Sequence, residues 1–147
     1  MTRIEILIET LDDLSWEVYP DIVESLMRFD RNQLTDELER QGPIYSYYYG
    51  LMCVAKKKLD ESNQFMTAAA ANARKEAKFD TKVKLTAKDL DDIAFTDPIY
   101  EDTLEKVRTY SEKYGLLKGI VASLEQKKDM LIQLSSNARA EANLYRN

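Results

Sequence analysis

The feature that most constrains the fold is an apolar repeat with a spacing of seven residues. In the first half it covers residues 35–80, where the repeating positions are Leu38, Tyr45, Met52, Leu59, Met66 and Ala73, with Tyr48, Ala55, Ser62 and Ala69 on a companion row. In the second half the positions are Tyr110, Leu117, Leu124, Leu131, Ala138 and Tyr145, with Val107, Tyr114, Val121 and Ala142 as companions. Heptads sustained over this length indicate long helices that pack on one another rather than a β-sheet.

Composition agrees with an all-α protein. The chain has 147 residues, which suits one domain, and only 4 Gly and 3 Pro, which are too few for a fold rich in turns. We expect a long antiparallel helical hairpin with short N-terminal helices, assembled into a homo-oligomer. The expected segments are short helices in 1–29, a long helix in 30–80, a basic connector in 81–97 and a long C-terminal helix in 98–147.

Helix boundary signals refine these segments. A capping box is expected at Thr2 with Glu5, and a cap at Thr86 followed by Asp89. Helix starts are expected at Pro20 and at Asp97-Pro98, the latter with Thr96 or Asp97 as the cap. The Thr2 helix would present Ile4, Leu7, Ile8 and Leu11 on one face. Gly42-Pro43 interrupts the main helix and predicts a kink or break of about one turn. Gly115 and Gly119 suggest a close helix contact, since each costs about 1 kcal/mol relative to Ala.

The net charge of −5 is unevenly distributed. Residues 1–55 hold 4 Lys/Arg against 11 Asp/Glu, residues 56–88 hold 9 against 4, and residues 89–147 hold 8 against 11. A basic zone therefore lies inside an acidic protein, and it is the electrostatic feature that needs explanation.

The basic zone contains two clusters. Lys56, Lys57 and Lys58 are read as a solvated helix face, with a contribution to binding left open. The second cluster comprises Arg74, Lys75, Lys78, Lys82, Lys84 and Lys88. Positive charge near a helix C-terminus complements the macrodipole, which accounts for residues 74–78 but not for the later lysines. Phosphate binding is the alternative reading, and Phe79 would be available to stack on a base.

The residue types present in the chain argue against enzymatic and metal-binding functions. There is no histidine, and no glycine-rich phosphate loop, nucleophile elbow or zinc spacing. Asp89, Asp91 and Asp92 are expected on a solvated face rather than around a metal. The single cysteine, Cys53, is expected to be a buried core residue. We therefore expect a non-enzyme without cofactor or metal.

The N-terminal apolar run is too short for a signal peptide or membrane span, because Glu5 and Glu9 interrupt it. We therefore expect a cytoplasmic protein with no membrane contact.

A second interface is expected on the long helix. Tyr47 and Tyr49 point away from the repeat, and the alanine-rich stretch 68–71 lets another backbone approach. The expected oligomer contacts are Tyr47, Tyr49, Ala69 and Ala73. Packing of the tyrosines against the N-terminal helices is the open alternative.

From Asp30 to about residue 141 the sequence resembles a known family. The carrying positions are Asp30, Leu34, Glu37, Leu38, Gln41, Pro43 and Tyr45, then Tyr48, Tyr49, Arg74, Lys84, Leu85, Thr86, Asp97, Pro98, Ile99 and Tyr100, and finally Leu117, Lys118, Gly119, Leu124, Lys127, Lys128 and Leu131. This order resembles phage UvsY-type recombination mediators. Residues 1–29 have no clear counterpart in the family, and their role is open.

The resemblance implies a small, helical, non-catalytic homo-oligomer acting in the cytoplasm of an infected bacterial host cell. Its implied partners are single-stranded DNA, the phage recombinase and the single-stranded-DNA-binding protein, because such mediators load the recombinase onto coated strands. The implied DNA contacts are Arg74, Lys75, Lys78, Lys82 and Lys84. The alternative is a coiled-coil scaffolding or structural phage protein without a nucleic-acid role. The subunit number, the identity of the protein partners and the base preference stay open.

Overall fold

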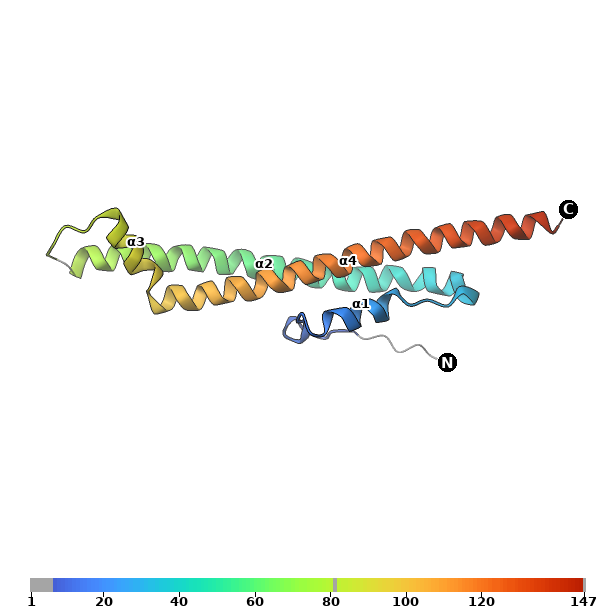
Figure 1. Ribbon diagram of the computed structural model, residues 1–147, viewed down its shortest axis with the longest axis horizontal. Helices are drawn as coiled ribbons and strands as arrows, with labels where there is room; N and C mark the ends of the chain where they lie inside the picture. Colours follow the sequence, from blue (N-terminus) through green and yellow to red (C-terminus); the bar gives the residue numbers. More distant parts are fainter. Residues whose placement is uncertain (1–6, 81, 147) are drawn as a thin grey trace. The chain divides into compact units, whose positions relative to one another are not determined.

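The computed structural model describes residues 7–80 and 82–146, and over these ranges it is helical and contains no strand (Figure 1). The elements are the short 3-10 turns η1 (Leu11–Asp13) and η2 (Arg31–Gln33) and the helices α1 (Tyr19–Met27), α2 (Leu34–Asp80), α3 (Ala87–Phe95) and α4 (Pro98–Leu144). The predicted all-α class is confirmed.

The chain divides into two compact units. The first contains the residues up to Cys53 together with those from Gly115 onward, and the second is Val54–Tyr114. Helices α2 and α4 contribute residues to both units. The turn η1 and the helix α1 belong to the first unit, and α3 belongs to the second.

The predicted apolar rows form the seam between helices. On α2 all ten predicted positions from Leu38 to Ala73 are buried or half-buried. On α4 the same holds for the predicted positions from Val107 to Leu131, whereas Ala138, Ala142 and Tyr145 are exposed. The heptad therefore predicted the buried face correctly until the last turns of α4, where the described residues of this chain supply no covering helix.

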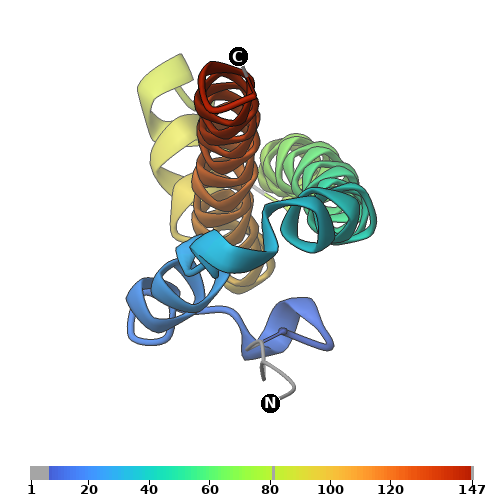
Figure 2. The same cartoon turned by 90° about the vertical axis from the view of Figure 1, so that its right-hand side faces the viewer.

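In the first unit α4 buries a second face. Leu116 and Ile120 are almost fully buried, as are five apolar residues of the N-terminal segment: Ile8, Leu11, Leu14, Ile22 and Leu26. Figure 2 shows α1 lying beside α4. Full burial of an aliphatic side chain contributes roughly 1.5–3 kcal/mol, so the N-terminal segment is part of this core rather than an appendage.

The start of the chain differs in part from its prediction. Thr2, Ile4 and Glu5 lie outside the described residues, and residues 7–10 are not helical, so the expected helical face through Leu7 and Ile8 is wrong over its described part. The Ile8 carbonyl instead accepts a hydrogen bond from the Tyr47 hydroxyl. The predicted α1 is present, with Pro20 in its first turn.

Helix α2 continues through Pro43, so the predicted break is absent. Proline removes one backbone donor and leaves the carbonyl four residues earlier, that of Glu39, without its helical partner. Glu39 is exposed, where water can serve that carbonyl, and the buried Gln41 and Tyr48 anchor α2 on both sides of the proline.

Both downstream helix starts are capped, and of the two predicted candidates at α4 it is Asp97 rather than Thr96 that caps the helix. Thr86 and Asp89 form a capping box at α3, and the hydrogen bonds from Thr86 lower the pKa of the Asp89 carboxyl. At α4 the Asp97 Oδ1 accepts from the backbone N–H of Ile99 at 2.9 Å and of Tyr100 at 3.3 Å. These caps satisfy backbone donors that a helix start leaves unpaired.

Replacing each of the two glycines of α4 by alanine is predicted to change the free energy of unfolding in opposite directions. A Cβ at Gly115 would meet nothing within 4 Å, whereas one at Gly119 would lie 3.3 Å from Tyr19 Cζ and closer still to its hydroxyl oxygen. Gly115→Ala is expected to raise the free energy of unfolding by up to about 1 kcal/mol through helix propensity. Gly119→Ala is expected to lower it by up to about 2 kcal/mol, because overpacking costs about 1–3 kcal/mol and the same gain in helix propensity offsets part of that cost.

Urea unfolding followed by circular dichroism measures both glycine variants. Adding Tyr19→Phe, which removes the colliding oxygen, should restore part of the loss in Gly119→Ala. Equal effects of the two glycine replacements would contradict the close contact between Gly119 and Tyr19.

Candidate nucleic-acid interface

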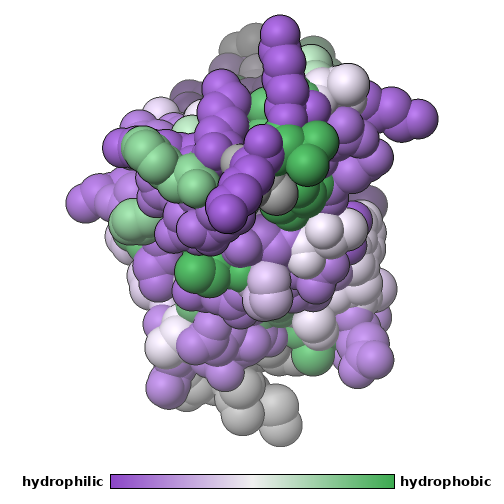
Figure 3. Space-filling model, turned by 90° about the vertical axis from the view of Figure 1, so that its left-hand side faces the viewer, coloured by the Kyte–Doolittle hydropathy of each residue, from purple (hydrophilic) through white to green (hydrophobic). Residues whose placement is uncertain are grey.

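Three of the five predicted DNA-contacting residues come together in the second unit. Lys78, at the end of α2, and Lys82 and Lys84, in the connector, line an open hollow of about 600 Å³. Its other lining residues are Val83, Leu85, Ala87 and Leu90. All three lysines are exposed. Figure 3 looks onto the end of the molecule that carries the connector and shows apolar patches among hydrophilic side chains.

The charge around this hollow is positive. Residues 78–90, which include every residue that lines it, contain four lysines against the two acids Asp80 and Asp89. Clustered ammonium groups raise the local concentration of anions, and exposed lysines contact phosphates as flexible point charges. We call the surface formed by Lys78, Lys82 and Lys84 the lysine hollow.

Arg74 and Lys75 do not line the hollow. Arg74 pairs with Asp91 through Nη2 at 2.9 Å and Nε at 3.0 Å, and its guanidinium lies 5.7 Å from the centre of the Phe95 ring. These contacts link α2 to α3 beside a small core of Ala70, Ala73 and Ala94. The structure therefore gives Arg74 an intrachain role in holding α3, while Lys75 is exposed on α2.

The earlier lysine run also has intrachain partners. Lys56 lies 5.6 Å from the Tyr114 ring centre and 3.1 Å from Asp60, and Lys58 lies 5.5 Å from the Tyr110 ring centre. A lysine over an aromatic face gains about 0.5–1 kcal/mol at an exposed site. Lys56 and Lys58 thus lie over tyrosines of α4 while they remain exposed.

The four predicted oligomer contacts differ in how exposed their side chains are. Tyr47 is 39% exposed and bonded to Ile8, and Tyr49 is 46% exposed and stacked on Tyr45. Ala69 is half-buried. Ala73 is only 6% exposed and packs in its own chain's core, so it does not offer a free surface to a second copy.

The prediction that Cys53 is buried is wrong, because its side chain is exposed. Successive residues of a helix are about 100° apart, so the residue after the half-buried Met52 falls outside the seam.

A buried lysine was missed by the sequence analysis. Lys127 of α4 is 0% exposed, and its ammonium donates to the Leu26 carbonyl at 2.6 Å and the Arg28 carbonyl at 2.9 Å. It also lies 3.7 Å from the Glu37 carboxylate, which is itself buried. Glu37 in turn accepts from the Asp30 backbone N–H at 3.3 Å. This network joins the end of α1, the start of α2 and the middle of α4.

The sequence does carry a signal for the burial of Lys127. Lys113, Ile120 and Lys127 share a seven-residue spacing next to the predicted apolar row, and all three are buried. Because two of its three positions are lysines, this row does not have the apolar pattern by which a buried heptad position is recognised.

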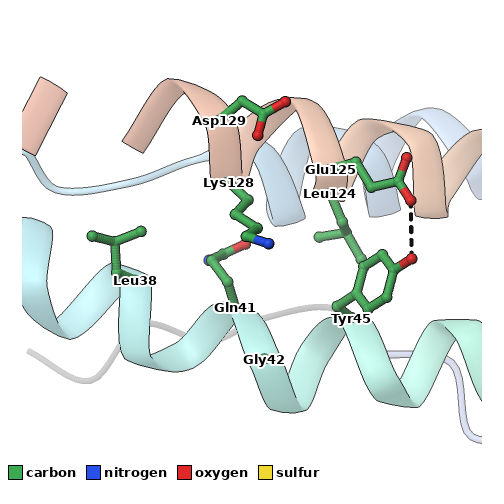
Figure 4. A pocket seen from close by; sticks show the side chains of 8 residues that line it. All are labelled: Leu38, Gln41, Gly42, Tyr45, Leu124, Glu125, Lys128 and Asp129. Carbon is green, nitrogen blue, oxygen red and sulfur yellow. Dashed lines mark hydrogen bonds between the residues drawn. The ribbon is translucent and has the colours of Figure 1, made fainter. Parts of the chain in front are cut away.

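A second hollow, of about 620 Å³, lies in the first unit between α2 and α4 (Figure 4). The Tyr45 hydroxyl donates to Glu125 at 2.9 Å, and this hydrogen bond raises the pKa of the Tyr45 phenol. The Gln41 amide donates to the Glu37 carbonyl at 3.1 Å. The Oε1 atom of Gln41 is buried and has no hydrogen-bond partner among the residues that the structure describes.

Gln41→Leu is therefore predicted to raise the free energy of unfolding by about 1 kcal/mol. A buried polar atom left unsatisfied costs about 1–3 kcal/mol, and the single hydrogen bond lost with the amide contributes about 1 kcal/mol. Urea unfolding measures the change. Gln64→Leu on exposed α2 surface is the control and should change stability by less than about 0.5 kcal/mol. A clear loss of stability in Gln41→Leu would show that Oε1 is satisfied in solution.

The described residues hold no cluster of three or more Cys, Asp or Glu arranged to bind a metal ion. Within the same residues, none of the helices is long and apolar enough to cross a membrane. No protein-family model, curated protein or solved structure matches this chain. The assignment of function therefore depends on the chain's own residues and on the sequence resemblance.

Proposed function

We propose that this protein is a single-stranded-DNA-binding recombination mediator of the UvsY type, and not an enzyme. The observation that carries the proposal is the lysine hollow, which gathers three exposed ammonium groups in an acidic protein. The resemblance supplies the biological role, namely loading of a phage recombinase onto strands coated with single-stranded-DNA-binding protein in the cytoplasm of the infected host.

The proposal includes an antiparallel hairpin. In the first unit Glu37 is close to Lys127 and Tyr45 to Glu125, and in the second unit Lys56 is close to Tyr114 and Lys58 to Tyr110. In both units the partner's number on α4 falls as the number on α2 rises. This is the order of contacts that two helices of opposite direction make.

The proposal also includes a homo-oligomer. Every described residue from 136 to 146 is exposed, including the apolar Leu144. Tyr145, which belongs to the predicted heptad, is 91% exposed. A second copy that covers these positions would bury the remainder of the heptad. Assembly also repeats the lysine hollow, and linked sites bind one strand far more tightly than a single site does.

Binding of a labelled thymidine oligonucleotide, followed by fluorescence anisotropy at about 50 mM salt, tests the DNA-binding part. Saturable binding by an oligomer, with its mass measured by light scattering, is expected. Stimulation of recombinase assembly on strands coated with single-stranded-DNA-binding protein tests the mediator part. An oligomer without any DNA binding would support the scaffolding alternative.

A further inference from the structure

Part of the lining of the lysine hollow is apolar, and we call Val83, Leu85 and Leu90 its apolar floor. Val83 lies between Lys82 and Lys84 in the chain and is 73% exposed, and Leu85 and Leu90 are half-buried. All three line the same hollow as the lysines. Lysine stems can lie along such a floor while their ammonium groups stay in water. The combination suits a ligand that has a flat apolar part flanked by anionic groups.

We propose that the lysine hollow seats an unpaired nucleobase against Val83, Leu85 and Leu90, while Lys78, Lys82 and Lys84 bind the phosphates beside it. This inference rests on the proposed function and adds the part of the strand that is recognised. The volume of about 600 Å³ lies within the roughly 300–1,000 Å³ typical of small-ligand sites.

Base seating would explain selection of single strands. In a duplex the base faces are stacked and the edges are paired, so an apolar floor has nothing to contact, whereas the phosphates remain available to lysines. The floor is largely aliphatic, and it contacts the faces of any base. The chemistry therefore favours single strands over duplexes with little preference among sequences.

The test compares a thymidine oligonucleotide with an abasic strand of the same length and phosphate number. The wild-type protein is expected to bind the thymidine strand at least about 5-fold more tightly, which corresponds to removal of roughly 40 Å² of apolar surface from water at about 25 cal/mol per Å². Val83→Ser should reduce this preference toward equality and leave affinity for the abasic strand unchanged. Ile99→Ser is the matched control, because Ile99 is 68% exposed, close to the value for Val83, and lies in the second unit outside the hollow.

The outcomes separate this inference from the proposed function. Equal binding of both strands by the wild-type protein would overturn base seating and leave phosphate binding intact. A preference that survives in Val83→Ser would place the bases elsewhere and would also overturn the inference. Absence of binding to either strand would overturn the proposed function itself. Val83 is exposed, so a folding defect is not expected, and circular dichroism checks this.

Discussion

Replacing Lys127 with methionine is expected to lower the free energy of unfolding by about 3–5 kcal/mol, the range for removal of one partner from a buried ion pair. The variant would leave the buried Glu37 carboxylate without this cation, and the Leu26 and Arg28 carbonyls without their ammonium donor. Methionine keeps most of the length of the side chain, so the loss reflects polar contacts rather than a cavity. Urea unfolding followed by circular dichroism measures it.

The adjacent Lys128→Met is the control, because Lys128 is exposed and its replacement should change stability by less than about 0.5 kcal/mol. Combining Lys127→Met with Glu37→Gln should recover part of the loss, since the buried charge is then removed as well. If Lys127→Met unfolds at the same urea concentration as the wild-type protein, the network does not stabilise the first unit.

The second large effect concerns DNA. Replacing Lys78, Lys82 and Lys84 together by alanine is expected to weaken binding of single-stranded DNA at least about 100-fold at about 50 mM salt, because each phosphate contact releases condensed counterions. The three side chains are exposed, so the fold and the oligomer should be unchanged. Fluorescence anisotropy measures the affinity, and light scattering checks the mass of the assembly.

The control for this variant replaces Lys57, Lys106 and Lys128, which are exposed and lie outside the lysine hollow. It removes the same total charge, so a general electrostatic effect would weaken both variants equally. A much smaller loss in the control is expected. Arg74 is kept intact in both variants, because its pairing with Asp91 would confuse a loss of DNA contacts with release of α3.

The sequence predicted those parts of the fold that depend on local pattern. The heptad rows defined the seam, and the Thr86–Asp89 and Asp97–Pro98 signals placed the starts of α3 and α4. Each of these predictions uses residues within a few turns of one another. A seven-residue spacing or a cap carries its own physical reason, so no knowledge of distant partners was needed.

The sequence pattern did not show the contacts that a distant segment supplies. Lys127 is buried because the end of α1, about 100 residues away in sequence, supplies carbonyl acceptors. The role of Arg74 depends on Asp91 in a different helix, and the basic cluster could not show which member pairs inside the chain. Ala73 was expected at an oligomer contact, whereas α3 covers it within its own chain. In these three cases charge and spacing placed the residue in a cluster or a row but did not show its partner.

The salt dependence of single-stranded DNA binding tests the central claim most directly. We expect the logarithm of the wild-type binding constant to fall linearly with the logarithm of the salt concentration. We also expect the Lys78/Lys82/Lys84 alanine variant to have a shallower slope by about 2 for each hollow engaged, since each of three contacts contributes roughly 0.7. The Lys57/Lys106/Lys128 control should keep the wild-type slope. Equal slopes for the wild-type protein and the hollow variant, or no wild-type binding at low salt, would contradict the assignment of the lysine hollow as the DNA-binding site.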